Sequence, residues 1–228
     1  MERTHYRLLA ALFEYPDAGY PQRVLAAKDF LDGRYIKAGV ELDRFLAFLP
    51  TQDLRSMQEL FTRSFDVQAA TTLDIGYVLF GDDYKRGEML ANLNREQCAA
   101  KIDCGTELAD YLPNLLQLMA AHEDEDLIHD LAQEILAPAL RQMISEFDPD
   151  RVEQRNVSFI KHYKTLIENP AVHSAAVTLY QFALRSLYQV LKQDFLLIET
   201  IPLKFTSDFL ASVGRENAIE EKSAMAQY

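Results

Sequence analysis

Four acidic residues stand in two short stretches of the chain, Asp82 and Asp83 in the first and Glu107 and Asp110 in the second. Brought together by the fold, these carboxylates could act as the acid–base group of a small helical enzyme or metal-dependent hydrolase. Asp82 and Asp83 directly follow Gly81, where one helix should end and the next begin, and Asp110 precedes another helical pattern. Capping of the free amides at these helix starts explains each aspartate singly. We therefore expect no enzymatic activity, with the carboxylate enzyme as the alternative.

Two further groups of residues have types that could do chemistry. A helix would place His122, Asp126 and His129 on one face, as metal ligands require, but no fourth ligand is identifiable and the surrounding carboxylates are typical of an acidic first turn. Cys98 and Cys104 lack the Cys-x-x-Cys spacing of a redox pair. No glycine-rich phosphate loop occurs. The sequence therefore predicts no metal site, no catalytic residue and no stoichiometrically bound cofactor.

The composition is acidic, with 23 Lys and Arg against 35 Asp and Glu and a formal net charge of -12 in 228 residues. Such a charge repels nucleic acids and anionic membrane surfaces unless a separate basic patch exists, and we expect no such patch. A basic peptide, by contrast, would be attracted within about 8–10 Å. No apolar run approaches the ~18–20 residues of a membrane span. We expect a cytoplasmic protein without direct membrane insertion.

Apolar residues recur with a helical period along most of the chain, and no strand-like alternation of useful length occurs. This pattern predicts an all-α fold, a single compact bundle of about eight to ten helices. The bundle should span residues 1–195, followed by a loosely held, partly flexible extension over 196–228. Early helices are expected at about residues 3–14, 21–31, 40–49 and 52–65. Later ones should begin near Asp82–Asp83, Asp110, Glu123–Asp126, Asp148–Pro149 and Asn169–Pro170.

A short helix should precede the first acidic pair. Thr71 or Thr72 is expected to cap it, and Leu73, Tyr77 and Phe80 follow the spacing of one buried face. Further along, Pro138 should bend or split the helix that starts in the acidic cluster.

Several motifs occur in a distinctive order. They are Leu8-Leu9-x-x-Leu12-x-x-Tyr15-Pro16, Phe65-Asp66, an aromatic run ending in Phe80-Gly81-Asp82, Arg86-Gly87, and Glu107-Leu-x-Asp110-x-Leu112-Pro113. Together they resemble the chaperones that mature molybdenum enzymes of the dimethyl-sulfoxide reductase superfamily, specifically the nitrate-reductase assembly branch. The resemblance covers residues 6–145. The chain departs from it at Ala109, where many relatives carry proline, and at Gln117, where glutamate is usual.

This resemblance implies a dedicated cytoplasmic chaperone. Such a protein binds the N-terminal or twin-arginine-type segment of a molybdoenzyme catalytic subunit and permits insertion of the bis-guanylyl-dinucleotide molybdenum cofactor before membrane attachment or export. The peptide-binding patch of the family maps onto Tyr77, Phe80, Gly81, Asp82, Asp83, Arg86, Glu107, Asp110, Tyr111 and Pro113. In this mapping Asp82 and Asp83 face the peptide, and Arg86 bridges to Glu107 or Asp110. The identity of the client, its export and the oligomeric state stay open.

Overall fold

The computed structural model describes residues 3–67, 69–148, 150–152 and 178–197. Every regular element in these ranges is a helix, which confirms the all-α prediction. The chain divides into two units, Met1–Leu197 and Ile198–Tyr228, and the second lies outside the described residues together with most of the extension expected over 196–228. The helices predicted to begin at Asp148–Pro149 and Asn169–Pro170 also fall largely outside them. None of the described helices has the length and apolar character needed to cross a membrane.

The first part of the unit contains the helices predicted there. They are α1 (His5–Ala10) with the 3-10 turn η1 (Ala11–Phe13), α2 (Tyr20–Asp32), α3 (Ile36–Phe48) and α4 (Leu54–Phe65). The predicted boundaries are close to the observed ones, except that α3 begins at Ile36 instead of Val40. The remaining elements are α5 (Ile75–Phe80), α6 (Tyr84–Ala99), α7 (Leu112–Ala121), α8 (Glu125–Asp130), the π-helix η2 (Leu131–Leu136), α9 (Ala137–Glu146) and α12 (Tyr180–Asp194).

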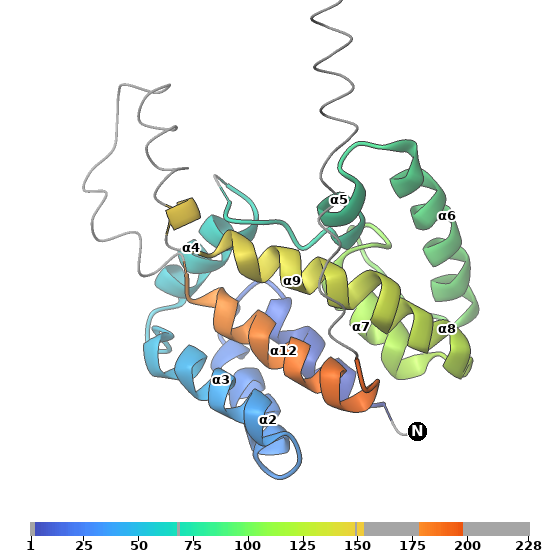
Figure 1. Ribbon diagram of the computed structural model, residues 1–228. Helices are drawn as coiled ribbons and strands as arrows, with labels where there is room; N and C mark the ends of the chain where they lie inside the picture. Colours follow the sequence, from blue (N-terminus) through green and yellow to red (C-terminus); the bar gives the residue numbers. More distant parts are fainter. Residues whose placement is uncertain (1–2, 68, 149, 153–177, 198–228) are drawn as a thin grey trace, which may run out of the picture. The chain divides into compact units, whose positions relative to one another are not determined.

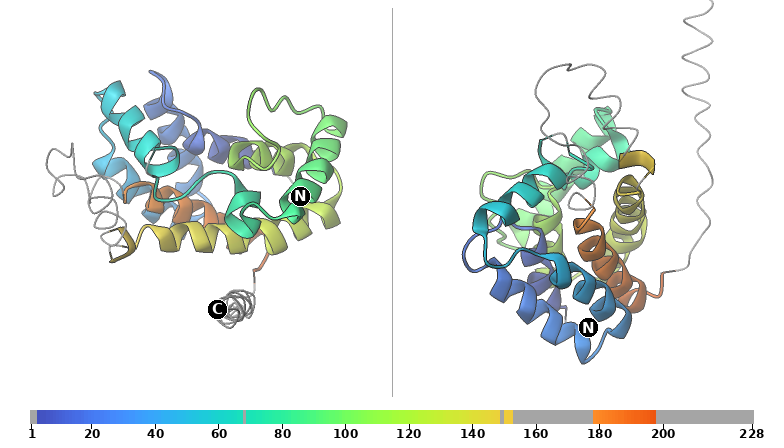
Figure 2. Two further views of the ribbon diagram at one scale, coloured as in Figure 1. Left: turned by 90° about the horizontal axis from the view of Figure 1, so that it is seen from above. Right: turned by 90° about the vertical axis from the view of Figure 1, so that its left-hand side faces the viewer.

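Helix α12 lies in the middle of the unit, between α3 and α9 (Figure 1). Figure 2 shows the same order from the side. Most of its apolar residues, among them Leu184, Leu187 and Leu191, are buried. Ser186, which is also buried, donates a hydrogen bond of 2.9 Å to the carbonyl of Ala38 in α3. A helix with buried residues around much of its circumference is a core helix, and the early helices pack around it.

Aromatic side chains fill the space between α12 and the early helices. The ring of Tyr180 lies 5.2 Å from Phe45, 5.7 Å from Phe61 and 4.9 Å from Phe65, measured between ring centroids. These are the tilted and edge-to-face arrangements that aromatic pairs prefer. The Tyr180 hydroxyl is 3.1 Å from that of Tyr20, so its polar end is also satisfied.

The acidic cluster forms a helix start, as the sequence predicts. Asp124 is the N-cap of α8 and accepts hydrogen bonds from the amides of Asp126 and Leu127. The helical path continues through η2, where the Ala137 amide bonds to the more distant carbonyl of Ala132, and Pro138 then lies in the first turn of α9. A proline inside a continuous α-helix would lose a backbone bond, and the change to wider π-type turns directly before it interrupts the regular ladder there.

A buried carboxylate joins the two ends of the unit. Asp194, at the end of α12, accepts hydrogen bonds from the hydroxyls of Tyr6 (2.9 Å) and Tyr35 (2.7 Å) and lies 2.8 Å from Nε2 of His5. The side chain of Asp194 is only 9% exposed. Burial opposes ionisation of this group, but the hydrogen bonds from His5, Tyr35 and Tyr6 outweigh it and lower the pKa of Asp194.

We expect the substitution Asp194→Asn to lower the free energy of unfolding near neutral pH by about 2–4 kcal/mol, because an amide cannot accept all three hydrogen bonds. A carboxyl group with a lowered folded pKa stabilises the fold above its unfolded pKa of about 3.9, and this contribution is lost as the pH falls through the folded pKa. The gap between wild type and variant should therefore be constant above about pH 5 and shrink below about pH 4. Urea denaturation at several pH values measures it.

The exposed Asp29 in α2 provides the matched control, since Asp29→Asn makes the same chemical change on the surface. It should alter stability by less than about 0.5 kcal/mol. Equal stability of the Asp194 and Asp29 variants would contradict the role assigned to the buried carboxylate.

Candidate functional site

Residues 74–87 comprise helix α5, a tight turn at 81–83 and the first turn of α6, and we call this segment the α5–α6 corner. Helix α5 ends at Gly81, whose backbone has φ +60° and whose amide bonds to the Tyr77 carbonyl at 2.8 Å. Positive φ at a helix end strongly favours glycine, so the predicted stop at Gly81 is confirmed. Helix α6 starts with Asp83 as N-cap, accepting from the amide of Lys85 at 2.9 Å. Asp82 is exposed, and among the described residues its side chain has no hydrogen-bond or ion-pair partner.

The register of α5 differs from the prediction. The helix begins at Ile75, after Asp74, so neither Thr71 nor Thr72 is its N-cap residue. Its buried residues are Ile75 and Gly76, whereas Tyr77 is 44% exposed. The expected single buried face of Leu73, Tyr77 and Phe80 is therefore wrong: Leu73 is buried but precedes the helix, and Phe80 is only partly buried.

Backbone hydrogen bonds connect the corner to the second acidic stretch. The amide of Ile75 donates to the carbonyl of Asp110, and the amide of Leu112 donates to the carbonyl of Leu73, both at 2.9 Å. These two bonds form an isolated antiparallel bridge between Asp74 and Tyr111. The two motifs are thus held side by side before any side chain contributes.

An ion pair buried beneath this bridge connects the same segments. Arg86 Nε lies 2.9 Å from Asp110 Oδ2, and its NH2 lies 3.2 Å from Asp74 Oδ2. The side chain of Asp110 is fully buried and that of Arg86 is 17% exposed. The predicted bridge from Arg86 to Asp110 is therefore confirmed, whereas exposed Glu107 is not a partner among the described residues.

Asp110 does not cap the following helix, contrary to the prediction. Tyr111 holds the N-cap position of α7, and the Asp110 carboxylate points instead to Arg86. Its second oxygen, Oδ1, is buried without a hydrogen-bond partner in the described part of the chain. Arg86 is therefore the side chain that compensates the charge of Asp110 in the described part of the chain, and the stability of the buried carboxylate depends on this guanidinium.

Gly76 makes room for the ion pair. A Cβ atom at this position would lie 2.6 Å from Asp110 Oδ2, closer than a methyl group can approach, and in tight contact, at 3.2 Å, with Arg86 Cγ. Glycine inside a helix costs up to about 1 kcal/mol relative to alanine, so its presence in this short helix requires such a packing reason.

Tyr77 covers the outer side of the pair. Its ring centroid lies 5.4 Å from the Arg86 guanidinium carbon, a cation–π contact. On the other side, burial together with the nearby Asp110 carboxylate raises the pKa of Asp74, although Arg86 acts in the opposite direction. Arg86 is thus enclosed by two carboxylates and an aromatic ring, and its side chain is a structural element of the corner.

The segment before α7 is anchored from both sides. Gln97 in α6 donates to the carbonyl of Ala109 at 2.8 Å, and Asn114 in α7 donates to the carbonyl of Leu108 at 3.0 Å. Pro113 lies in the first turn of α7, as predicted, and is buried. These anchors leave the side chains of Glu107 and Leu108 on the surface, the latter 49% exposed.

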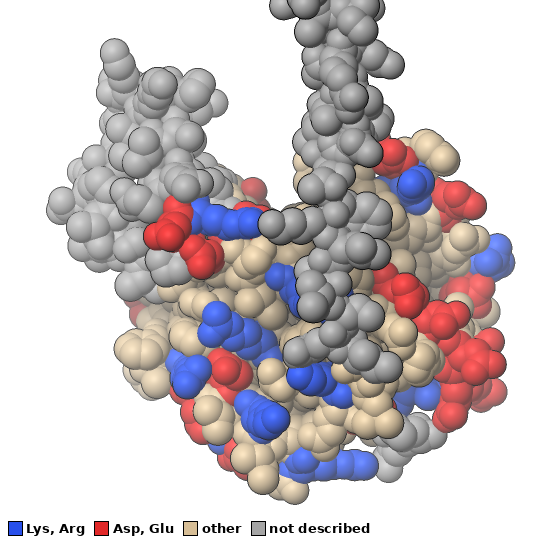
Figure 3. Space-filling view, viewed as in Figure 1, with Lys and Arg blue, Asp and Glu red and all other residues tan. Residues whose placement is uncertain are grey.

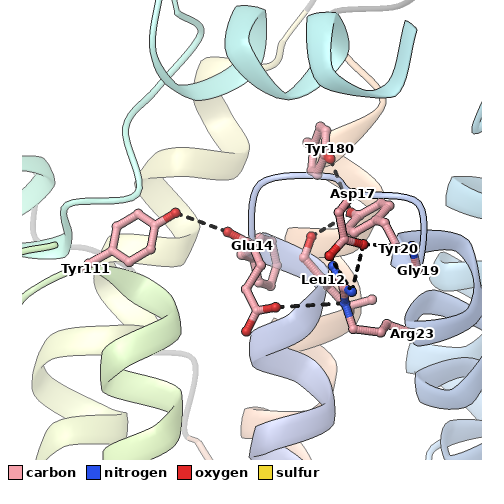
Figure 4. Close-up of polar contacts among 9 residues, drawn as sticks. Leu12, Glu14, Asp17, Gly19, Tyr20, Arg23, Tyr111 and Tyr180 are labelled. Atoms are coloured by element: carbon pink, nitrogen blue, oxygen red, sulfur yellow. Dashed lines mark hydrogen bonds and ion pairs between the residues drawn. The ribbon is translucent and has the colours of Figure 1, made fainter. Parts of the chain in front are cut away.

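Tyr111 ties this segment to the beginning of the chain. Its hydroxyl donates to the carbonyl of Phe13 at 3.3 Å (Figure 4). Next to this contact, Arg23 lies 3.8 Å from Glu14 and 2.9 Å from Asp17 in the loop after η1. Burial, with the Glu107 carboxylate second, raises the pKa of Tyr111, so the phenol stays neutral and acts as a hydrogen-bond donor.

The ten mapped residues therefore fall into two groups. Asp110 and Pro113 are buried, Arg86 is nearly so, and Phe80, Gly81 and Tyr111 are partly covered. The exposed members are Tyr77, Asp82, Asp83 and Glu107. Together with Tyr84, which is 78% exposed and was not in the mapped patch, we call these exposed residues the corner surface.

The residues considered for a metal site are spread over the end of α7 and α8. His122 accepts a hydrogen bond at Nδ1 from the amide of Asp124 and lies 3.4 Å from Glu96, while Asp126 and His129 are exposed on α8. Within the described residues, no three His, Cys, Asp or Glu side chains are placed to hold a metal ion. The hydrogen bond from the Cys104 thiol goes to Gln97 at 3.1 Å.

Comparison with known proteins assigns no family to this chain. No protein-family model matches the sequence, and no curated protein matches it either. The functional interpretation is therefore built on the geometry above and on the motifs of the sequence.

Asp74 and Gly76 are the two site residues that the sequence analysis missed. Asp74 could have been noticed as an acidic residue directly before an apolar helical run, which is the usual place of an N-cap. Gly76 could have been noticed as a glycine inside a predicted helix, which indicates a close approach of another group. Neither residue can be assigned its role until Asp110 is known to lie next to α5.

We expect Gly76→Ala to destabilise the protein by about 1–3 kcal/mol, because the added methyl group would displace Asp110 or Arg86. Gly87→Ala in α6 is the matched control, since nothing lies within 4 Å of a Cβ built there. Relieved of the glycine penalty, that variant should be as stable as wild type or more so by up to about 1 kcal/mol. Chemical denaturation measures the free energy of unfolding of both variants. A Gly76→Ala variant as stable as Gly87→Ala would contradict the packing argument.

Removing the guanidinium in Arg86→Ala should cost about 3–5 kcal/mol, because it leaves the buried Asp110 carboxylate uncompensated. The neighbouring exposed Lys85, changed to Ala, should shift stability by less than about 0.5 kcal/mol. Replacing both partners, as in Arg86→Met with Asp110→Leu, should cost less than Arg86→Ala alone. An unchanged melting temperature for Arg86→Ala would show that the pair does not hold the corner together.

Proposed function

We propose that this protein is a cytoplasmic chaperone of molybdoenzyme assembly that binds the N-terminal segment of the catalytic subunit through the corner surface. In this role it keeps the segment accessible while the molybdenum cofactor enters the client, before membrane attachment or export. The observation that carries the proposal is the difference between the buried and the exposed residues of the corner. Buried residues hold two motifs together, and the side chains left on the outside are acidic and aromatic.

The chemistry of the corner surface fits a basic, partly apolar peptide. Asp82 has no partner among the described residues, and Asp83 and Glu107 are also exposed, so their carboxylates are available to guanidinium groups. Charge-assisted hydrogen bonds of this kind are about twice as strong as neutral ones. Tyr77 and Tyr84 add apolar area with polar ends, the composition found at peptide-binding hot spots.

The architecture of the site supports binding more than catalysis. Of the four carboxylates considered for acid–base chemistry, Asp83 caps α6 and Asp110 is neutralised by Arg86. A rigid scaffold beneath exposed anchors reduces the entropy that binding must overcome. The net charge of -12 adds long-range attraction for a segment that carries a pair of arginines.

Changing Asp82 and Asp83 together to Asn tests the proposal. Asn caps a helix about as well as Asp and is of the same size, so the fold should be preserved while two charges are lost. Binding of a fluorescently labelled peptide should weaken by about five- to twenty-fold, and the difference from wild type should shrink as salt is raised. The peptides to use cover the N-terminal residues of the dimethyl-sulfoxide-reductase-family catalytic subunits encoded in the same genome.

The control pair is Glu123→Gln with Asp126→Asn, which removes the same charge from the exposed start of α8 and spares its cap Asp124. This variant should bind the peptide within about two-fold of wild type, because His122, next to Glu123, contacts Glu96 near the C-terminal end of α6, whereas the corner lies at the N-terminal end of that helix. If no such peptide binds the wild type, the chaperone proposal fails. If both variants lose affinity equally, the acids act only through net charge and the corner surface is not the site.

A further inference from the structure

The surface formed by α3 and α12 is basic although the protein as a whole is strongly acidic. Figure 3 shows Lys and Arg gathered over these helices, whereas Asp and Glu gather on the side of α6 and α8. In α12 no acidic residue precedes Asp194, and the Asp194 carboxylate points inward to Tyr6 and Tyr35. Residues distant in sequence make up this surface, which is why no basic cluster is visible along the chain.

An aromatic ring between two guanidinium groups lies at the centre of this surface. The guanidinium carbons of Arg44 in α3 and Arg185 in α12 lie 6.0 Å and 5.9 Å from the ring centroid of Phe182. Among the residues that the structure describes, the acid paired with either of them is Glu41, 3.3 Å from Arg44 and itself 19% exposed. Stacking on Phe182 fixes the direction of both cations and leaves hydrogen-bond donors free on their edges.

Apolar side chains continue this surface along α3. Ile36, Val40 and Phe48 are 75%, 48% and 74% exposed, unusual values for residues of this type. With Arg44, they follow one another at intervals of four residues, which places them along one winding stripe of the helix. The stripe extends over about 18 Å, the length of roughly three helical turns. We call Lys37, Arg44, Phe48, Phe182 and Arg185, with Ile36 and Val40, the basic face.

We propose that the basic face binds an acidic amphipathic helix of a partner protein, with carboxylates on Arg44, Arg185 and Lys37 and apolar residues against Phe48 and Val40. A helix matches the stripe because its own side chains repeat at three to four residues. The proposal does not rest on the corner surface, which carries the opposite charge and selects a basic segment.

The charge distribution favours a short peptide segment over other anions. At physiological salt, charges interact over about 8 Å, so a ligand confined to the basic face is attracted by its cations. The acids close to them are Glu41, which is paired with Arg44, and Asp43, which is paired with Lys28. A nucleic acid or an anionic membrane extends much further and would meet the acidic remainder of a protein with net charge -12.

The test uses the full chain and a defined probe. The probe is a labelled, terminally blocked helical peptide of about four turns, with Glu along one side and Leu and Phe along the other, and its partner peptide has Lys in place of every Glu. We expect the Glu peptide to bind, with an affinity that falls at high salt, and the Lys peptide to bind at least about ten-fold more weakly to the basic face.

Two protein variants locate the binding. Arg44→Glu with Arg185→Glu should weaken binding of the Glu peptide by at least about ten-fold, and Phe48→Ser should weaken it by about three- to ten-fold through the loss of apolar contact. Lys85→Glu with Arg95→Glu, both exposed on α6, makes the same change in net charge and should leave the affinity within about two-fold. Circular dichroism checks that each variant is folded.

Several outcomes would overturn the proposal. These are the absence of Glu-peptide binding, displacement of the bound Glu peptide by the Lys peptide as effective as by unlabelled Glu peptide, and equal affinities of the two charge-reversal variants. Sedimentation that reveals a dimer dissociated by Arg44→Glu with Arg185→Glu would assign the face to a second copy of the chain. Tighter binding of a single-stranded oligonucleotide or of phosphatidylglycerol vesicles, lost in the same variant, would assign it to an extended polyanion.

Discussion

The ion pair between Arg86 and Asp110 is the interaction on which the arrangement of the corner depends. Moving a carboxylate completely out of water is costly, and attraction to one guanidinium offsets this cost only when the geometry is held closely. That requirement explains the neighbouring features together. Gly76 leaves space for the carboxylate, the bridge at Asp74 fixes the backbone, and the ring of Tyr77 lies against the Arg86 guanidinium. A pair of this kind specifies which segments lie side by side more than it adds stability.

The same pair marks the boundary between the buried and the exposed residues of the corner. Side chains that appear together in one motif have different environments in the folded chain: Asp110 is fully buried, whereas Asp82 is open to solvent. Among the cations, exposed Arg44 and partly buried Arg185 flank the ring of Phe182, whereas Arg86 is enclosed by its partners. Two surfaces of opposite sign would allow one small protein to hold two unlike segments at once, a basic one at the corner and an acidic one along α3.

Helix positions could be predicted from sequence because burial on one side of a helix imposes a 3.6-residue period. The glycine stop at Gly81 and the acidic start of α8 follow from local backbone needs and were equally predictable. The register of α5 was not, because it depends on Asp110, a residue far along the chain. The basic face also escaped prediction, since α3 and α12 become neighbours only in three dimensions. Local rules thus gave the elements, and long-range contacts decided which of their side chains are exposed.

The central position of α12 has a consequence for how the protein is made. The helix that fills the middle of the unit is synthesised after all the helices it covers, and Asp194 at its end meets residues of the first helix. While the chain is still emerging from the ribosome, the earlier helices lack the apolar partner that shields them from water. Folding of this unit therefore depends on contacts between α12 and helices far earlier in the chain. Such contacts form slowly compared with single helices, and they can form only after α12 has been translated.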